Sequence, residues 1–181
     1  MYKKIVVKVG TKVLTKNERL NEEVVGTIVK EVAALRAQGV EVVVITSGAV
    51  ATGKSLLPGS TSERQVYAAV GQIGLMSLYA QLFGEHGYQC AQILVTKGDF
   101  RDKQHYANMK LCFENLLREK IIPVVNENDA ISTPELVFTD NDELAGLIAS
   151  QIEADAVIFL TSVDGVLMSI DGKGENVVPE I

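Results

Sequence analysis

Short apolar runs alternate with longer amphipathic stretches along this chain. The apolar runs are rich in Val and Ile and have the length of strands that are buried on both faces of a sheet. They cover residues 5–9, 40–45, 92–95, 121–125 and 156–160. A helical pattern lies between each pair of runs. The sequence therefore predicts an α/β fold, a three-layer sandwich in which helices cover both faces of a mainly parallel central sheet.

The first helical pattern has sequence signals at both of its ends. Asn21 can accept hydrogen bonds from the first free backbone N–H groups, and Gly39 provides a stop. Leu20 and Val25 have the spacing of a hydrophobic staple across this cap. The apolar residues of one face are Val25, Ile28, Val32 and Leu35. Helical spacing also predicts helices at residues 63–83, 103–118 and 141–151.

Polar and small residues follow the apolar runs, at the points where the predicted strands end. They are Gly10-Thr11, Thr46-Ser47-Gly48, Thr96, Asn126-Glu127-Asn128-Asp129 and Thr161-Ser162-Val163-Asp164-Gly165. Ligands of parallel sheets bind at the carboxyl ends of the strands, so these residues are candidates for a site. Turns use the same residue types for local reasons, which explains Gly165 well. Local turn chemistry explains residues 126–129 less well, because desolvated amides and carboxylates require partners.

Lys8 lies inside the first predicted strand, between Val7 and Val9. A lysine among apolar neighbours needs an anion. Gly10 lets the backbone approach a phosphate, and a second amide-rich turn follows at Ser47-Gly48. Together these features predict a phosphoryl-binding site. The alternative is an edge-strand lysine whose ammonium group reaches water.

Residues 48–55 match the GxxxxGK[ST] pattern of a P-loop and follow an apolar run. A P-loop must lead into a helix whose N-terminal amides hold the phosphates. Pro58 and Gly59 would cut such a helix short. The strand that ends at Thr161 also lacks the following Asp that a P-loop enzyme uses for magnesium. We therefore reject the P-loop but keep it as the rival hypothesis.

Length and charge narrow the classes of function. The 181 residues are enough for one domain, predicted to span residues 1–181. The formal net charge is -6 and the basic residues are scattered, so a nucleic-acid partner is not expected. The N-terminal apolar run is shorter than that of a signal peptide, and no apolar stretch reaches the 18 residues of a membrane span. We expect a cytoplasmic protein with no membrane partner.

The cysteines and histidines form no recognisable chemical site in the sequence. Cys90 and Cys112 lack the spacing of a zinc or redox motif, so both are predicted to be small buried apolar residues. His86 and His105 have polar neighbours and are predicted to lie on the surface. No Ser-His-Asp arrangement and no set of metal ligands is predicted.

Several segments together resemble the glutamate 5-kinases, which belong to the amino acid kinase family. They are VVKVGTKVLT, VVVITSGAVATGK, AAVGQIGLMSLYAQLF, AQILVT, IIPVVNENDAI, FTDNDELA and FLTSVDGVL. The segments occur in the family's order across nearly the whole chain. NENDA followed by DND is the most specific element, since other amino acid kinases share only the lysine-glycine start and the glycine turns. The resemblance implies the amino acid kinase fold.

The resemblance also implies roles for individual residues. Asp129 would bind the ammonium of glutamate, Ser47 and Asn141 would bind its carboxylates, and Asp142 would orient the catalytic lysine. The nucleotide-binding positions would be Lys8, Gly10, Thr161 and Ser162, with Lys8 also offsetting charge in the transition state. Without the resemblance, the favoured explanation of Asp140, Asp142 and Glu143 is that acidic residues stabilise a helix N-terminus.

The activity implied is phosphorylation of the glutamate side-chain carboxylate by ATP with Mg²⁺, the first step of proline biosynthesis. Proline as a feedback inhibitor and a homo-oligomeric state are implied as well. Relatives continue past residue 181 with a glycine-rich nucleotide loop and a second catalytic lysine. The chain would then hold the glutamate-binding part and only the start of the nucleotide-binding part, which leaves its activity alone open. A non-catalytic module that binds glutamate or proline is the second hypothesis, and a P-loop NTPase is the third.

Overall fold

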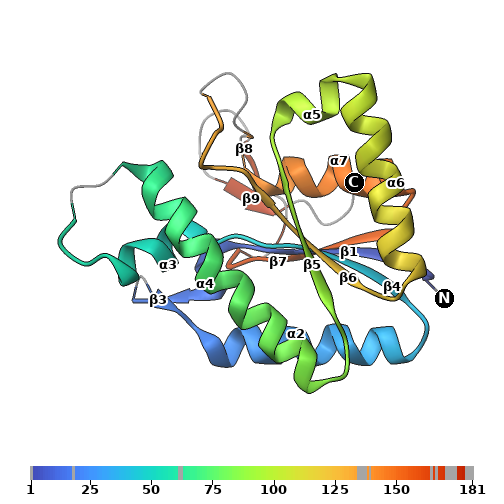
Figure 1. Ribbon diagram of the computed structural model, residues 1–181, viewed down its shortest axis with the longest axis horizontal. Helices are drawn as coiled ribbons and strands as arrows, with labels where there is room; N and C mark the ends of the chain where they lie inside the picture. Colours follow the sequence, from blue (N-terminus) through green and yellow to red (C-terminus); the bar gives the residue numbers. More distant parts are fainter. Residues whose placement is uncertain are drawn as a thin grey trace.

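The computed structural model describes residues 2–17, 19–60, 63–133, 138, 140–163, 165, 167–169 and 175–177 (Figure 1). The strands are β1 (Lys4–Val9), β2 (Thr15–Lys16), β3 (Arg19–Leu20), β4 (Glu41–Ile45), β5 (Cys90–Val95), β6 (Ile122–Glu127), β7 (Ala156–Leu160), β8 (Leu167–Ser169) and β9 (Glu175–Val177). The helices are α1 (Thr11–Leu14), α2 (Glu22–Ala37), α3 (Ala49–Leu56), α4 (Arg64–Glu85), α5 (Lys97–Arg101), α6 (Lys103–Arg118) and α7 (Asn141–Ile152). The five predicted strands and four predicted helices are all present, with ends shifted by no more than two residues.

The central sheet has the strand order β5-β6-β4-β1-β7, and every neighbouring pair is parallel. Strand β1 lies between β4 and β7, and Lys8 pairs with Ile45 on one side and with Phe159 on the other. The edge-strand explanation of Lys8 is therefore wrong. The short pairs β2-β3 and β8-β9 are antiparallel and lie outside this sheet.

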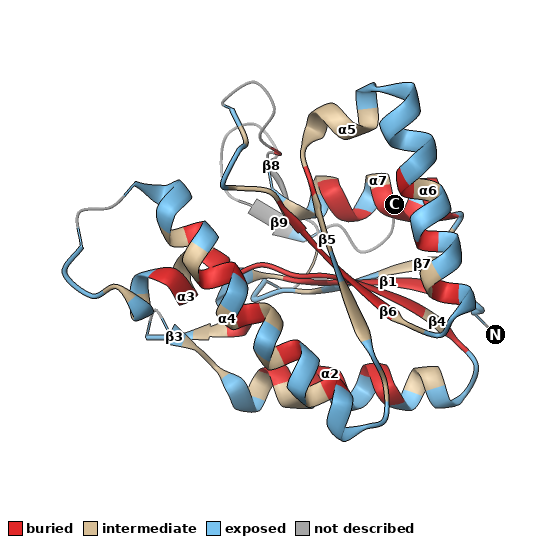
Figure 2. Ribbon diagram, viewed as in Figure 1, coloured by how far each residue is buried: buried red, intermediate tan, exposed pale blue. Residues whose placement is uncertain are grey.

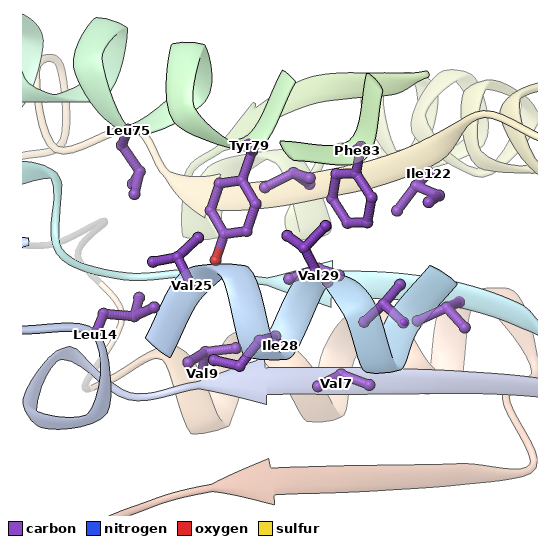
Figure 3. Close-up of a cluster of buried hydrophobic side chains, with 14 of the residues drawn as sticks. Val7, Val9, Leu14, Val25, Ile28, Val29, Leu75, Tyr79, Phe83 and Ile122 are labelled. Atoms are coloured by element: carbon purple, nitrogen blue, oxygen red, sulfur yellow. The ribbon is translucent and has the colours of Figure 1, made fainter. Parts of the chain in front are cut away.

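Alternate residues of the central strands enter two separate cores. Ile5, Val7 and Val9 of β1 pack with α2 and α4, whereas Val6 packs with α6 and α7. In Figure 3, Tyr79 and Phe83 of α4 point toward Val25 and Val29 of α2. Figure 2 shows the buried strands between these helix layers. The three-layer α/β sandwich is thus confirmed, and it results from strands that are apolar on both faces.

The helix α2 begins and ends as its sequence predicts. The side chain of Asn21 accepts a hydrogen bond from Val24 N at 3.4 Å, and Leu20 packs against the core that contains Val25. At the other end, Gly39 has φ +84°, a left-handed conformation that glycine adopts without steric strain. This helix therefore needs no long-range contact to fix its ends.

The helices α3 and α4 cross with almost no space between their backbones. A Cβ atom on Gly53 would overlap the backbone of Tyr67, and one on Gly71 would overlap the backbone of Ala49 and Gly53. Small residues at a crossing allow this close approach. Helix α3, which runs from the end of β4 into this crossing, is not among the helices that the sequence predicts.

Two expectations about apolar residues need correction. Helix α4 is long and apolar enough in composition to cross a membrane, although no such stretch was predicted. Its Leu75, Tyr79 and Phe83 are fully buried on the sheet, so the domain core accounts for this composition.

The two cysteines are less buried than predicted. Cys90 is only half-buried, and Cys112 is exposed on α6. The apolar stripe of α6 runs through Met109, Phe113 and Leu117 and leaves Cys112 outside.

Candidate active site

A pocket of about 690 Å³ opens at the carboxyl ends of the central strands. The strand ends provide Lys8, Ser47, Asn126 and Glu127, and Asp129 follows β6. The remaining lining residues come from the loops and helices around them: Thr11, Thr15, Gly48, Ala49, Val50, Ala51, Lys54, Arg64, Phe138, Asp140 and Asn141. Four predicted site residues, Lys8, Ser47, Asp129 and Asn141, therefore meet in one pocket, as the rule for parallel sheets predicts.

Lys8 provides a buried positive charge at this pocket. Its side chain is 10% exposed, and its Nζ lies 2.6 Å from Oδ1 of Asp142 in α7. A buried ammonium group is stable only when it is paired, and Asp142 supplies the pairing charge. Asp142 is about half exposed, so the pair faces solvent on the side of the carboxylate. The structure thus brings the two predicted catalytic residues together.

The acidic residues at the start of α7 have different partners. Asp140 is the N-cap, and its Oδ1 accepts hydrogen bonds from the backbone N–H groups of Asp142 and Glu143 at 2.9 and 3.0 Å. Glu143 pairs with Lys97 of α5. The helix-terminus explanation therefore accounts for Asp140, whereas Asp142 reaches the lysine of β1.

Asn141 joins the ends of two strands, β4 and β6, through its side-chain amide. Its Nδ2 lies 2.8 Å from Ser47 Oγ, 2.7 Å from the Thr46 carbonyl oxygen and 3.2 Å from Asn126 Oδ1. The amide donates in each case. Because Ser47 Oγ accepts from Asn141, the hydroxyl proton of Ser47 can be donated elsewhere. Asn141 therefore orients Ser47 at the wall of the pocket.

A chain of amide side chains extends from this point into the molecule. Asn126 Nδ2 donates to Gln72 Oε1 at 3.0 Å, and Gln72 Nε2 donates to Gln92 Oε1 at 2.9 Å. Asn126 and Gln72 are both buried. Buried amides that are hydrogen-bonded to one another fix side-chain orientations, because breaking one bond leaves a desolvated group without a partner. This network holds the pocket wall to α4 and β5.

Glu127 is a buried carboxylate beside the network. Its Oε1 accepts hydrogen bonds from the Phe138 N–H at 3.0 Å and from the Ser132 hydroxyl at 3.3 Å. Burial raises the pKa of Glu127 and the charge of Asp129 adds to this, while the Phe138 N–H opposes it. The loop after β6 is thereby tied to the strand end.

Asp129 and Arg64 form an ion pair at the pocket. Arg64 Nη2 lies 3.0 Å from Asp129 Oδ1. The Asp129 side chain is 14% exposed, whereas that of Arg64 is 68% exposed. Asp129 is therefore a nearly buried anion, and it is covered by a cation that extends from the start of α4.

Of the predicted nucleotide-binding residues, Lys8 lines the pocket, whereas Gly10, Thr161 and Ser162 lie outside its lining. Gly10 follows β1, and its N–H donates to the carbonyl oxygen of Leu160 at 3.0 Å. Thr161 and Ser162 come next after Leu160 and are both exposed. The structure thus places Gly10 beside the end of β7, and it brings neither Thr161 nor Ser162 into the pocket.

The P-loop-like string is a helix and not a loop. Residues Ala49–Leu56 form α3, and the Thr52 N–H donates to the Gly48 carbonyl oxygen at 2.9 Å. Amides that are bonded within a helix cannot wrap around a phosphate. The rejection of the P-loop is therefore supported, although Lys54 does line the pocket from α3.

From the sequence, Asn126 and Glu127 are candidates only as part of a polar cluster after a strand, Lys54 only as part of the rejected P-loop, and Arg64 is not a candidate at all. A signal for Asn126 and Glu127 was present, since two polar residues directly follow an apolar run and lie buried at the pocket. Gln72 also interrupts the apolar pattern of α4. Nothing local distinguishes Arg64 from other surface arginines, because its contact with Asp129 joins distant parts of the chain.

The chain is also similar in sequence to known proteins. Residues 3–181 match the amino acid kinase family. The chain is 51% identical to a glutamate 5-kinase of Chlorobaculum tepidum, an alignment that covers all of this chain and 52% of the relative. It is 44% identical to the glutamate 5-kinase of Bacteroides thetaiotaomicron, over 91% of this chain and 48% of the relative. The chain thus spans about half the length of these curated relatives. Since the family match covers nearly all of its residues, the chain belongs to the amino acid kinase family.

Proposed function

We propose that this chain provides the glutamate-binding part of a kinase that transfers the γ-phosphoryl group of ATP to the side-chain carboxylate of glutamate. The observation that carries the proposal is Lys8, a buried cation that lines one pocket with Ser47, Asp129 and Asn141. Lys8 offers an ammonium group for phosphoryl oxygens. Asp129 offers a carboxylate for the amino group of glutamate, and Ser47 offers a hydroxyl for a carboxylate. The relatives named glutamate 5-kinase support the same substrate.

The reaction requires positioning and charge neutralisation more than proton transfer. A glutamate carboxylate is already ionised at neutral pH and can attack the γ-phosphoryl group without a general base. Lys8 would bind the phosphoryl oxygens and offset the charge that develops there. Asp142 would hold Lys8 Nζ in place through the 2.6 Å contact. The Ser47 hydroxyl, oriented by Asn141, would donate to an oxygen of the acceptor carboxylate.

ATP and Mg²⁺ are part of the proposal, with Gly10, Thr161 and Ser162 as nucleotide contacts. Within the described residues, no three His, Cys, Asp or Glu side chains gather into a metal site. In the proposal the magnesium ion would be carried by the nucleotide, since Mg²⁺ keeps several waters and takes few protein ligands. Bound to the ATP phosphates, the ion would neutralise part of their charge. Asp142 contacts Lys8, and Asp140 lines the same pocket.

The wider context is proposed from the same relationship. A glutamate kinase of this type would catalyse the first step of proline biosynthesis, with proline as a feedback inhibitor. We expect the protein to work in the cytoplasm as a homo-oligomer, without nucleic-acid or membrane partners. Helix α4 packs Leu75, Tyr79 and Phe83 into the core, as a helix of a globular domain does.

Trapping the product with hydroxylamine tests the function. The chain would be incubated with glutamate, ATP and Mg²⁺, and γ-glutamyl hydroxamate would be measured for wild type, Lys8→Ala, Lys54→Ala and the control Lys30→Ala, an exposed lysine of α2. We expect glutamate-dependent hydroxamate that falls about 100-fold or more in Lys8→Ala and is retained in Lys30→Ala.

Other outcomes separate the remaining hypotheses. Loss of ATP turnover in Lys54→Ala together with full activity in Lys8→Ala would contradict the proposal and support a P-loop enzyme. A folded chain that binds glutamate without forming hydroxamate would be a binding module. A longer chain that restored turnover would instead assign the missing step to a further segment.

A further inference from the structure

Arg64 is placed at the pocket in a way that folding does not explain. It is the first residue of α4, where the positive end of the helix dipole disfavours a cation. The first turn of α4 contains no acidic residue, and the N-cap Glu63 makes no side-chain capping bond. Because the Arg64 side chain is 68% exposed, its ion pair with Asp129 contributes little to stability.

The two partners of this ion pair have unequal freedom. Asp129 lies in the pocket with 14% of its side chain exposed, so its position is fixed by its surroundings. Arg64 reaches the same pocket from outside on a long side chain. A guanidinium at the mouth can turn from one carboxylate to another, and its planar fork matches a carboxylate with two parallel hydrogen bonds.

The ion pair is the charge complement of an amino acid head group. The α-carbon of an amino acid carries an ammonium and a carboxylate side by side. Asp129 and Arg64 present a carboxylate and a guanidinium 3.0 Å apart. If Asp129 accepts from the substrate ammonium, the adjoining α-carboxylate must lie close to the cation that already contacts Asp129. A carboxylate has two oxygens, so Asp129 can bind the ammonium while Arg64 stays near.

We infer that Arg64 binds the α-carboxylate of the amino acid substrate and restricts the site to substrates that have this group. The inference rests on the proposed function, because it takes the glutamate ammonium to be at Asp129. It assigns the two ends of the substrate to different cations. Lys8, paired with Asp142, serves the end where the phosphoryl group is transferred, and Arg64 serves the end that does not react.

Lys54 is the other cation that lines the pocket from a helix, so it is the rival for this role. Arg64 is favoured because its contact with Asp129 keeps it close to the place where the substrate ammonium would bind. The two residues can be separated by ligand binding, without any need for turnover.

Calorimetric titration with two ligands tests the inference. The ligands are glutamate and 4-aminobutyrate, which is glutamate without its α-carboxylate. The proteins are the wild-type chain, Arg64→Gln, Arg64→Lys, Lys54→Gln, Asp129→Asn and the control Arg118→Gln, an arginine of α6 outside the pocket lining.

The expected result is a loss that depends on the ligand. Arg64→Gln should weaken glutamate binding about 10- to 100-fold, and it should leave 4-aminobutyrate binding unchanged or slightly stronger. Arg64→Lys should recover part of the glutamate affinity, since it keeps the charge but not the fork. Asp129→Asn should weaken both ligands, and Arg118→Gln should weaken neither.

Three results would overturn the inference. Equal weakening of both ligands by Arg64→Gln would show a structural role, and no weakening of glutamate would show no role in binding. A glutamate-selective loss in Lys54→Gln instead of Arg64→Gln would assign the α-carboxylate to Lys54. If the folded wild-type chain bound no glutamate, the proposed function would fail and the inference with it, which distinguishes that case from the other three.

Discussion

Lys8 Nζ lies 2.6 Å from Asp142 Oδ1, and this contact joins β1, an interior strand of the sheet, to the first turn of α7. The two residues are unequally exposed, at 10% for the lysine side chain and 51% for the aspartate. The lysine is therefore the partner that depends on the pair. Removing the carboxylate leaves a buried charge without compensation, whereas removing the ammonium leaves a carboxylate that water can solvate.

A double-mutant cycle at this pair should show strong coupling. We expect Asp142→Asn to lower the free energy of unfolding by about 1–2 kcal/mol, less than for a fully buried pair because Asp142 is half exposed. Lys8→Met should be nearly neutral, and Asp142→Asn should have no further effect in the Lys8→Met background. Urea denaturation of the four proteins measures this coupling. If the effects of the two substitutions on the free energy of unfolding were additive within about 0.5 kcal/mol, the contact would not contribute to stability.

Much of the fold could be predicted because its signals are local. The central strands are apolar on both faces, so each appears in the sequence as a short run of mostly apolar residues. Asn21 and Gly39 mark the ends of α2 within the sequence itself. The set of polar residues after the runs then predicted the pocket edge, because parallel strands bring their carboxyl ends together.

The rest depends on contacts between distant residues. The string 48–55 has the letters of a loop motif, yet it forms α3 because Gly53 and Gly71 allow two helices to touch. That crossing has no local signal. The role of Arg64 becomes visible only from its ion pair with Asp129, which is 65 residues away in the sequence. Thr161 and Ser162 could be assigned only by resemblance, and their roles stay predictions.

The α3–α4 crossing gives a prediction with a control in the same helix. Gly71→Ala should lower the free energy of unfolding by about 2–4 kcal/mol, because the new methyl group would overlap the backbone of α3. Gly84→Ala, also in α4, meets nothing within 4 Å and should raise stability by about 0.5–1 kcal/mol through helix propensity. Thermal and urea unfolding of both variants compare the two effects. A stabilising Gly71→Ala would show that the helices are farther apart than described.

Glu127 predicts a pH dependence of stability with a defined sign. Burial raises the pKa of Glu127 above the ordinary 4.5, so folding favours the protonated form. The stabilising contribution is complete below the ordinary pKa and is lost as pH rises through the folded-state pKa. Glu127→Gln keeps an oxygen that can accept from the Phe138 N–H without the charge. The variant should therefore be more stable than wild type at pH 7.

The test compares urea unfolding at pH 7 and at about pH 4, where the carboxyl group of wild type is largely neutral. The advantage of Glu127→Gln should disappear at the lower pH. Glu31→Gln, at an exposed position of α2, is the matched control. A gain for Glu127→Gln that is the same at both pH values would show that the charge of Glu127 does not cause it.

Tyr79 should make stability fall in alkaline solution. Burial raises its pKa to about 12, although the hydrogen bond with Thr46 Oγ1, 3.0 Å away, acts in the opposite direction. The ring lies in the core between α2 and the sheet (Figure 3). Since the neutral phenol is favoured in the fold, its contribution is complete below the unfolded pKa of about 10 and is lost as pH rises toward 12. The loss should reach about 2–3 kcal/mol at the upper end.

Tyr79→Phe removes the ionising group but leaves Thr46 without this partner. At pH 8 the variant should be less stable than wild type by about 1 kcal/mol, the value of one neutral hydrogen bond. As pH rises from about 10 to 11.5 the wild type should lose stability faster, so the difference between the two proteins should shrink and then reverse. Tyr2→Phe removes a hydroxyl from an exposed position and is the matched control. The contrary result would be parallel curves of stability against pH for wild type and Tyr79→Phe. It would mean that the phenol ionises without a cost to folding. A fully buried ring cannot do this unless the core opens around it first.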